Sequence, residues 1–356
     1  MSSDATLARQ FERLAHTVAD PATLPDQLLA ALARVVPLDS YSWAAIDPRS
    51  LLPTNAIGST TPVQNTVLWE EQELIARGNE PGDLRSMARS GRAVALLSEI
   101  VGERKDRSLI YRHVLRPNGL EHQLRCGLAL DGVHWGQLHL ERRAECPDFS
   151  SRDVALVKAL APHLAHAFRR WLIAEPGGAS GASSPALPGV IVLDEDNELE
   201  SINPEAEHWL NEWGLSDIEH APAAISAVVG AARARAAGCS DAIPSTRLRL
   251  GTGVWLSVRA TQLARPDRRA GTAVVLERAA ADQVAPLIAR ANQLTARETE
   301  IAMLVLRGLS TREMSAELFI SPHTVQDHLK SIFEKVGVRS RRALATEIFE
   351  PHYQAA

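Results

Sequence analysis

Between residues 294 and 353, apolar positions recur at helical spacing in four short segments separated by polar turns. Each segment opens on a hydroxyl residue suited to cap a helix, and in the first two a glutamate follows three residues later, which makes a capping box. The four openings are Thr295 with Glu298, Ser310 with Glu313, Ser321 with Pro322, and Ser340. Gly308 and Gly337 stand where the first and third segments should end. The pattern predicts four helices joined by short turns.

The third segment, residues 322–336, has two opposed faces. Its apolar residues fall on the side that a helix would bury: Val325, Leu329, Ile332, Phe333 and Val336. Its polar residues fall on the other side: His323, Gln326, Asp327, Lys330 and Glu334. A short helix that follows another after a tight turn, with a face of hydrogen-bonding side chains, suits the major groove of DNA. The segment is therefore predicted to read DNA.

The first 173 residues combine helical segments with alternating strands. Apolar residues at helical spacing predict helices from Leu7 to Val18 and from Leu28 to Val36. Strands are predicted at 41–48, 51–58, 123–130 and 135–140. Asp131-Gly132 lies between the last two, and this dipeptide is a strong hairpin signal. A long helix should then run from Ser151 to Trp171, with a bend at Pro162.

A run of glycine, serine, alanine and proline from Glu175 to Pro185 has no core residues and predicts a flexible linker. After it, residues 189–202 read as a strand, a polar turn and a second strand, and Asn203-Pro204 opens a helix. An alanine-rich helical stretch follows at about 221–237. The closing strands of a second sheet are predicted at 245–250, 254–263 and 271–277.

Composition and charge narrow the class of protein. The chain has 356 residues, enough for two or three domains, and its 45% apolar and 23% charged content is ordinary for a globular protein. It shows no apolar run long enough to span a bilayer and no signal-peptide pattern, so we expect a cytoplasmic protein without a membrane partner. From residue 294 onward eight basic residues balance eight acidic ones. A neutral DNA-reading segment holds phosphates weakly, which favours a dimer on two half-sites.

Four stretches of the C-terminal segment resemble the LuxR-type helix-turn-helix family: Leu294–Glu298, Gly308–Ser310, Ser321–Val325 and Ile332–Val338. The resemblance implies a transcription regulator whose second helix meets the DNA backbone and whose third helix enters the major groove. By position it implies that Gln326, Asp327 and Lys330 face the bases, and that the phosphate contacts are Ser310, Thr311, Ser321, His323 and Thr324. Many relatives place lysine at Gln326 and an apolar residue at Asp327. Glutamine can pair with adenine and aspartate can accept from cytosine, so the resemblance does not specify the target sequence or the affinity of this chain.

In the LuxR family the fourth helix often dimerises, and by position the resemblance implies a dimer seam at Leu344, Ile348 and Phe349. The alternative is that these residues cover the core of their own domain.

The two preceding segments carry weaker resemblances. Helices flanking an antiparallel sheet resemble a GAF domain, and the hairpin followed by Asn203-Pro204 and Ala206 resembles the start of a PAS domain. The fold expected is multidomain α+β, with two antiparallel-sheet sensor domains before an all-α four-helix domain. The expected boundaries are 1–174 for the GAF-like domain, 175–187 for the linker, 188–280 for the PAS-like domain and 281–356 for the helix-turn-helix domain.

Cofactor and metal sites find little support in the sequence. The cysteines, Cys126, Cys146 and Cys239, are scattered without metal-ligand spacing and fit reduced structural thiols. His163 and His166 share a helix face but have no third ligand nearby. Isolated histidines are weak haem candidates, and these are His113, His134 and His139. Aromatic residues in small domains are more often core than pocket lining, so the cofactor stays unknown and no metal is expected.

Other classes of function fit the sequence less well than a regulator does. The phosphate-binding motif G-x-x-x-x-G-K-[ST] is absent, as are a nucleophile elbow and the β-α alternation of a receiver domain. The chain is therefore expected to be no enzyme but a regulator that binds double-stranded DNA as a homodimer, with a small-molecule ligand and RNA polymerase as further candidate partners. The alternative is a signalling enzyme or ligand-binding protein with an appended DNA-binding domain.

Overall fold

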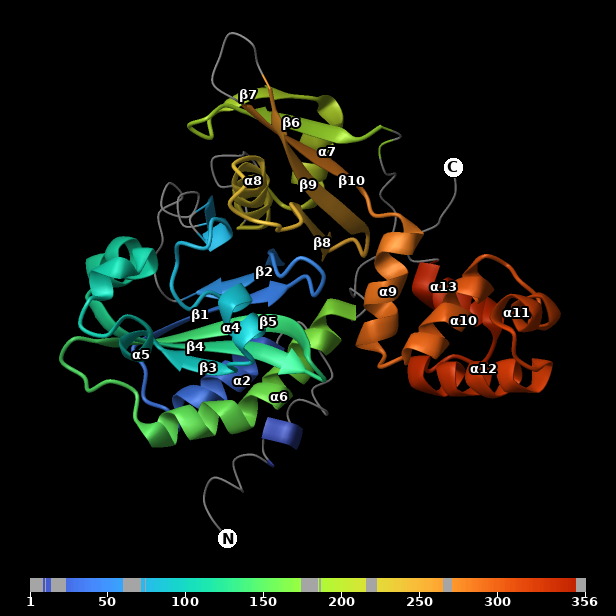
Figure 1. Cartoon of the computed structure of the whole chain (residues 1–356), viewed down its shortest axis with the longest axis horizontal. Helices are drawn as coiled ribbons and strands as arrows, with labels where there is room; N and C mark the ends of the chain where they lie inside the picture. The colour runs from blue at the N-terminus through green and yellow to red at the C-terminus, as the bar shows by residue number, and fades with distance from the viewer. Residues whose placement is uncertain are drawn as a thin grey trace. The chain divides into compact units, whose positions relative to one another are not determined.

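The computed structural model describes residues 9, 11–13, 24–59, 72–73, 75–173, 185, 187–215, 223–264 and 271–349. Its strands are β1 (Ser40–Ile46), β2 (Pro53–Ser59), β3 (Val94–Leu96), β4 (Leu120–Leu130), β5 (Val133–Arg143), β6 (Gly189–Leu193), β7 (Leu199–Ile202), β8 (Ser245–Arg249), β9 (Trp255–Leu263) and β10 (Gly271–Arg278). Its helices are α2 (Leu24–Ala33), α4 (Leu84–Ser90), α5 (Leu97–Val101), α6 (Ser151–Ile173), α7 (Pro204–Glu212), α8 (Ala223–Ala236), α9 (Ala281–Ala291), α10 (Ala296–Leu306), α11 (Thr311–Leu318), α12 (Pro322–Val336) and α13 (Arg341–Phe349) (Figure 1).

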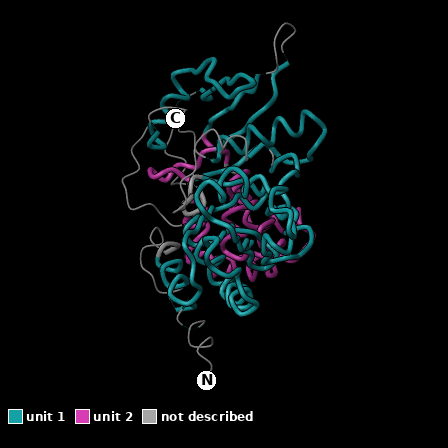
Figure 2. The backbone as a smooth tube through the Cα atoms, turned by 90° about the vertical axis from the view of Figure 1, so that its left-hand side faces the viewer, with its two compact units in different colours: residues 1–174, 185–248, 257–277 teal, residues 175–184, 249–256, 278–356 magenta. Residues whose placement is uncertain are grey.

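The chain divides into two compact units, which Figure 2 colours separately. The first comprises residues 1–174, 185–248 and 257–277, and the second comprises residues 175–184, 249–256 and 278–356. The strands of both sheets fall mostly in the first unit, whereas α9 to α13 belong to the second.

The first sheet has the strand order β2-β1-β5-β4-β3, and its neighbouring strands pair in antiparallel fashion. β4 and β5 form its central hairpin, and the two residues between them, Asp131 and Gly132, have φ values of 51° and 76°. A two-residue turn with both φ values positive matches the twist of the strands, which is why Asp-Gly predicted the hairpin correctly. α6 packs along one face of this sheet against β3, β4 and β5, with α2 beside it (Figure 1).

The two faces of the first sheet differ in chemistry. The face toward α6 is apolar, and Trp43 and Leu138, which are partners in the register, lie on it; Trp43 meets Phe168 of α6 edge to face at 5.1 Å. The opposite face carries polar residues that also pair across the strands: Gln123 with Glu141, and Arg125 with His139. Gln123, Arg125 and Glu141 are nevertheless buried, at 1%, 2% and 2% exposure. This buried polar face needs hydrogen-bond partners from the segments that cover it.

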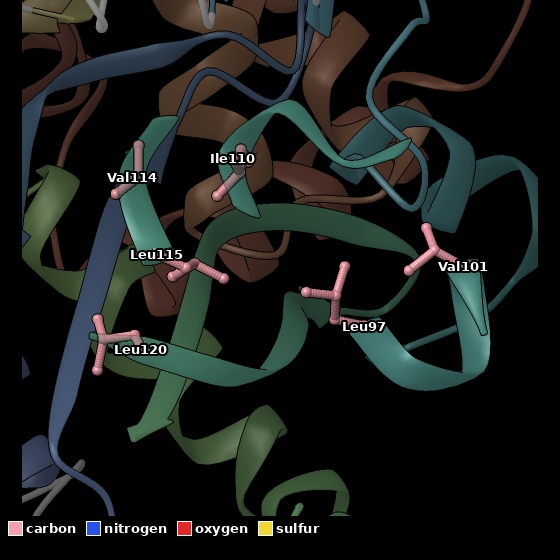
Figure 3. Close-up of a cluster of buried hydrophobic side chains, with 6 residues drawn as sticks. All are labelled: Leu97, Val101, Ile110, Val114, Leu115 and Leu120. Atoms are coloured by element: carbon pink, nitrogen blue, oxygen red, sulfur yellow. The ribbon is translucent and has the colours of Figure 1, made fainter. Parts of the chain in front are cut away.

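A small apolar cluster anchors one of these covering segments. It joins α5, the helical turn at residues 108–115 and the start of β4, through Leu97, Val101, Ile110, Val114, Leu115 and Leu120 (Figure 3). Neither α5 nor this turn was predicted from the sequence. The cluster holds the turn in place, so that Ser108 and the backbone amide of Leu109 donate hydrogen bonds to Glu80 at 2.7 and 2.8 Å.

The second sheet has the strand order β7-β6-β10-β9-β8, which repeats the order of the first sheet position for position. Asn203 caps α7, since its side-chain oxygen accepts from the amides of Ala206 at 3.0 Å and Val190 at 2.7 Å. Gly189 on β6 permits close packing, because a Cβ there would lie 2.7 Å from the Cα of Ala206. The Asn-Pro signal in the sequence therefore predicted the start of α7 correctly.

α8 is buried around nearly its whole circumference, and of its residues only Arg233, Arg235 and Ala236 are not buried. It contacts β2 of the first sheet (Figure 1). Gly230 permits a separate close approach to residues 72–73, because a Cβ there would lie 2.8 Å from the carbonyl oxygen of Gln72. The alanine-rich composition that gave a vague sequence signal thus serves close packing, since small side chains let neighbouring backbones approach.

Buried polar contacts join the two sheets within the first unit. Arg247 of β8 donates to Asp47, at the end of β1, through Nε at 2.8 Å and Nη2 at 2.6 Å. The amide of Arg247 adds a third bond to Asp47 at 3.0 Å, and the side chains are 8% and 2% exposed. Arg233 of α8 bonds Glu73 on one side and the carbonyl of Asp194 on the other. The segments expected as two sensor domains are therefore held together by charge-assisted hydrogen bonds.

These observations confirm the predicted α+β class, with two antiparallel sheets followed by helices. The predicted linker at 175–187 lies almost wholly outside the described residues, as do most residues of the helix expected from Leu7 to Val18. Within the described residues, none of the helices is at once long and apolar enough to cross a membrane. The boundaries at 174, 187 and 280 stay a prediction.

Candidate nucleic-acid interface

Both predicted capping boxes are present at the starts of α10 and α11. In the first, the Thr295 amide donates to Glu298 at 2.7 Å and the Glu298 amide donates to the Thr295 hydroxyl at 3.2 Å. In the second, Ser310 and Glu313 exchange the equivalent bonds at 2.7 and 3.3 Å. Each box satisfies two amides that a helix start leaves without partners, so the boxes fix where α10 and α11 begin.

α12 begins and ends where the sequence predicted. Ser321 accepts from the amide of Thr324 at 3.0 Å, Pro322 is the first helical residue, and Gly337 ends the helix with φ of 82°. Of the predicted buried stripe, Val325, Leu329 and Ile332 are fully buried. Phe333 and Val336 are only partly buried, which corrects the expectation for these two.

The opposite side of α12 is exposed. Gln326, Asp327 and Lys330, the residues predicted to face bases, all lie there with Glu334. A carboxylate oxygen of Asp327 lies within hydrogen-bond distance of His323 Nδ1, at 3.0 Å. Gln326 Nε2 donates to the hydroxyl of Thr311 at 3.4 Å. An open hollow of about 430 Å³ follows this side of the helix, and Gln326, Lys330, Phe333, Glu334 and Arg339 are among the residues that line it. The three side chains can therefore meet a partner molecule without rearrangement of the domain.

The predicted phosphate-contact residues gather at the starts of α11 and α12. Ser310 and Ser321 are exposed and act as caps, and Ser321 also shares a hydrogen bond with the hydroxyl of Thr324 at 2.9 Å. Thr311 accepts from Arg341 Nη2 at 2.5 Å as well as from Gln326, and His323 has 86% of its side chain exposed. The contact between Thr311 and Gln326 brings the first turn of α11 next to α12. Helix starts are favourable places for phosphate groups.

Glu298 joins α10 to the end of α12. It is 4% exposed and accepts from Lys335 Nζ and from the hydroxyl of Ser331, both at 2.6 Å. Burial by itself raises the pKa of Glu298, but the hydrogen bonds from Lys335, Ser331 and Thr295 outweigh it and hold the pKa at about 2. From the sequence, this glutamate was recognised only as a capping residue. Its second role joins the start of α10 to the last turns of α12.

Some charged side chains of this domain form ion pairs with one another, and others do not. Several carboxylates are already paired: Glu298 with Lys335, Glu300 with Arg297, and Glu317 with Arg307. Among the described residues from 294 onward, four exposed basic side chains form no ion pair with a carboxylate: Arg312, Lys330, Arg339 and Arg342. Of these four, only Lys330 was singled out from the sequence. The three pairs remove equal numbers of basic and acidic charges, so the balance of eight against eight is unchanged, but these four side chains stay available to phosphate groups.

Of the three residues predicted to form the dimer seam, only Leu344 has a described side chain. Leu344 of α13 is completely buried, so it packs inside its own domain, as the alternative held. The side chains of Ile348 and Phe349 lie outside the described residues. α13 packs on α9 and α10, and Arg341 donates to the carbonyl of Leu309 at 3.2 Å.

Comparison with known proteins bears on this domain. Residues 292–348 match the family model described as bacterial regulatory proteins, luxR family. The spore germination protein GerE of Bacillus subtilis is 38% identical over 55 residues, which are 15% of this chain and 74% of that protein. The chain belongs to the luxR family of bacterial regulatory proteins. The resemblance identified from the sequence is thereby confirmed.

Other luxR-family matches cover smaller shares of their proteins. The transcriptional regulatory protein UhpA of Escherichia coli is 38% identical over 61 residues, 17% of this chain and 31% of that one. A protein of Mycobacterium bovis named as an HTH-type transcriptional regulator is 43% identical over 54 residues. These residues are 15% of this chain but only 6% of the length of that protein. Matches of this length correspond to the C-terminal domain alone, so they carry no information about the two sheets.

Solved structures resemble the chain only distantly. SdiA in complex with octanoyl-rac-glycerol has a TM-score of 0.39 and 12% identity over 100% of this chain and 99% of that one. Another matching structure is of SdiA from Escherichia coli. A GAF domain/HD domain protein from Geobacter sulfurreducens has a TM-score of 0.30 and 17% identity over 43% of this chain and 95% of that one. Scores this low establish neither a shared arrangement nor a shared ligand.

Proposed function

We propose that the chain is a cytoplasmic transcription regulator that inserts α12 into the major groove of an operator. The observation that carries the proposal is the exposed row of Gln326, Asp327 and Lys330, on the side of α12 opposite its buried stripe. Side chains with hydrogen-bonding ends at this position can reach base edges. Membership of a family of bacterial regulatory proteins supports the same conclusion.

The proposed regulator acts as a homodimer on an inverted repeat. Among the described residues from 294 onward, one copy offers four exposed basic side chains without carboxylate partners, and binding affinity grows with the number of phosphates neutralised. Two copies double that number and read half-sites about one helical turn apart. Because Leu344 is buried, the seam would use other residues of α13.

The two sheets are proposed as the sensing part, with residues 1–174 GAF-like, residues 188–280 PAS-like and residues 281–356 the DNA-binding domain. Two sheets of identical strand order, joined by the bonds of Arg247 and Arg233, support this division into paired modules. Capture of genomic fragments bound to the full chain tests the function, since an inverted repeat among them is expected. A protein that retains no sequence-specific fragment would disprove it.

Gln326→Ala should relax sequence preference at one position of each half-site. A bidentate pair between an amide and a base discriminates by about 1–3 kcal/mol, so the preferred base should lose up to about a hundredfold of its advantage. Competition binding with single-base variants of the recovered operator measures the change. Arg312→Ala is the matched comparison, because Arg312 is not among the predicted base-facing residues and the loss of its charge should weaken every sequence alike. An unchanged preference in Gln326→Ala would remove this residue from the reading set.

Three single substitutions should each reduce the salt dependence of DNA binding: Arg312→Ala, Arg339→Ala and Arg342→Ala. Removal of one phosphate-binding side chain lowers the slope of log K against log salt by about 0.9 per domain. Filter binding or anisotropy over a range of salt concentrations gives the slope. Arg290→Ala is the control, since Arg290 is an equally exposed arginine on α9. An equal slope change for Arg290 would mean that general charge, rather than this surface, determines binding.

A further inference from the structure

The buried polar face of the first sheet is not completely filled. A cavity of about 50 Å³ lies between this face and the segments that cover it. Arg85, Gln137 and His139 supply hydrogen-bonding groups to its wall, and Ile46, Leu51 and Ala76 are among its apolar neighbours. A concave site with an apolar wall and a few converging polar groups is the usual form of a small-molecule site.

Most of the charge in this wall is already satisfied. Glu80 and Arg125 form an ion pair at 2.6 Å with side chains 1% and 2% exposed. Arg125 also donates to Gln123 and to the carbonyl of Pro81, both at 2.7 Å. Burial, aided by the nearby charge of Arg125, lowers the pKa of His139 to about 3, so its ring is neutral at physiological pH. These buried groups are already paired with one another, so they offer little uncompensated charge to a ligand.

Arg85 is different. Among the described residues, its only hydrogen bond runs from Nη2 to the carbonyl of Ser50 at 3.2 Å. Burial lowers the pKa of its guanidinium, and Asp83 partly opposes that effect. A guanidinium has five N–H donors, so several remain for an acceptor that enters the cavity. Arg85 is only partly buried, and a charge-assisted hydrogen bond from it to an oxyanion is stronger than its present bond to a neutral carbonyl.

We propose that this cavity binds a monocarboxylate no larger than acetate, and that Arg85 holds its carboxylate. A carboxylate matches the planar fork of arginine with two parallel hydrogen bonds. A phosphate carries more negative charge and would be repelled by the neighbouring Asp83 and Glu80, which also line the cavity. The apolar residues opposite suit the hydrocarbon part of the ligand. The cavity deepens the proposed function and rests on the first sheet being a sensing module.

The position of Arg85 also connects the cavity with the second sheet. Its bond to Ser50 holds the loop at residues 47–52, and Leu51 and Leu52 of that loop line the cavity. The same loop starts at Asp47, which Arg247 of β8 binds through three hydrogen bonds. A carboxylate that takes Arg85 away from Ser50 would therefore change the loop that joins the two sheets.

Calorimetric titration of the full chain with formate and acetate tests the proposal, with acetamide as the uncharged match of acetate and with inorganic phosphate as the other oxyanion. We expect a carboxylate to bind and acetamide and phosphate to bind at least about tenfold more weakly, because a charge-assisted pair is worth more than about 1.4 kcal/mol. Arg85→Gln should weaken carboxylate binding by at least the same factor. Arg89→Gln, the same change one turn further along α4 at an exposed position, should leave it unaltered.

Three results would overturn the proposal: no carboxylate binding at any soluble concentration, equal affinity for acetate and acetamide, or full affinity in Arg85→Gln. If Arg85→Gln does not fold, as judged by its circular dichroism, Arg85→Lys retains the charge and loses the planar fork, and it should still bind more weakly than the unaltered chain. These titrations contain no DNA. A failure here leaves operator binding intact, and a failure of operator capture leaves the titrations interpretable.

Discussion

Asp47→Ala should lower the free energy of unfolding of the sheet-bearing unit by about 3–5 kcal/mol, the usual result of removing one partner from a buried ion pair. Asp47 is 3% exposed. Its carboxylate accepts hydrogen bonds from Nε, Nη2 and the backbone amide of Arg247, and from the backbone amide of Arg49 at 2.8 Å. Without the carboxylate, the charge of Arg247 stays buried but loses the anion that balances it. Urea denaturation followed by circular dichroism measures the loss.

Two comparisons make this prediction specific. Glu99→Ala removes the carboxylate of an ion pair with Arg92 in which both side chains are about half exposed, and it should cost no more than about 1 kcal/mol. Asp47→Leu combined with Arg247→Met should recover much of the stability, since an apolar replacement of a buried pair is often neutral. Equal losses for Asp47→Ala and Glu99→Ala would show that the pair contributes nothing beyond a surface contact.

Glu298→Gln should destabilise the DNA-binding domain by about 3 kcal/mol near neutral pH. The folded-state pKa of about 2 compares with 4.5 for an ordinary glutamate, and each pKa unit corresponds to about 1.4 kcal/mol. The side chain is only 5% exposed, so solvent screens little of this contribution. Because Glu298 also positions the end of α12, the variant should bind operator more weakly even at temperatures where it remains folded.

The pH dependence of stability checks the same residue. A carboxyl group whose pKa is lowered by folding stabilises the protein fully above about 4.5, and this contribution disappears as the pH falls toward 2. The unaltered chain should therefore lose stability across that interval more steeply than Glu298→Gln does. Glu300→Gln, which removes an exposed charge paired with Arg297 on the same helix, is the control and should change the profile little. Parallel profiles for the chain and Glu298→Gln would contradict the assignment.

Features determined by neighbouring residues were the ones that sequence reasoning predicted well. The capping pairs Thr295–Glu298 and Ser310–Glu313 lie within one helical turn, and the Asp131-Gly132 turn needs only two residues with positive φ. Such signals depend on backbone hydrogen bonds and sterics close by in the chain. The starts of α10, α11 and α12, and the hairpin of β4 and β5, could therefore be predicted from sequence alone.

Features that depend on distant partners could not. The sequence separates Asp47 from Arg247 by 200 residues and Glu298 from Lys335 by 37, so nothing in either neighbourhood signals a pair. One feature that depends on distant residues could nevertheless have been predicted from the sequence. The alternation of β4 and β5 about a two-residue turn places Arg125 opposite His139, and it could have indicated the polar face of the first sheet. The exposure of α12 was predicted, whereas the burial of Leu344 required knowledge of how α13 packs.

The burial of α8 on nearly all sides has a practical consequence for work with shortened forms of this protein. A truncation that starts after residue 185 would remove β2 from α8 and present a surface of alanine and valine side chains to water. Fragments cut at the apparent linker are therefore poor choices for expression, because an uncovered apolar helix invites aggregation. Cloning boundaries placed after β10, near residue 279, keep both sheets intact and separate only the helices that follow.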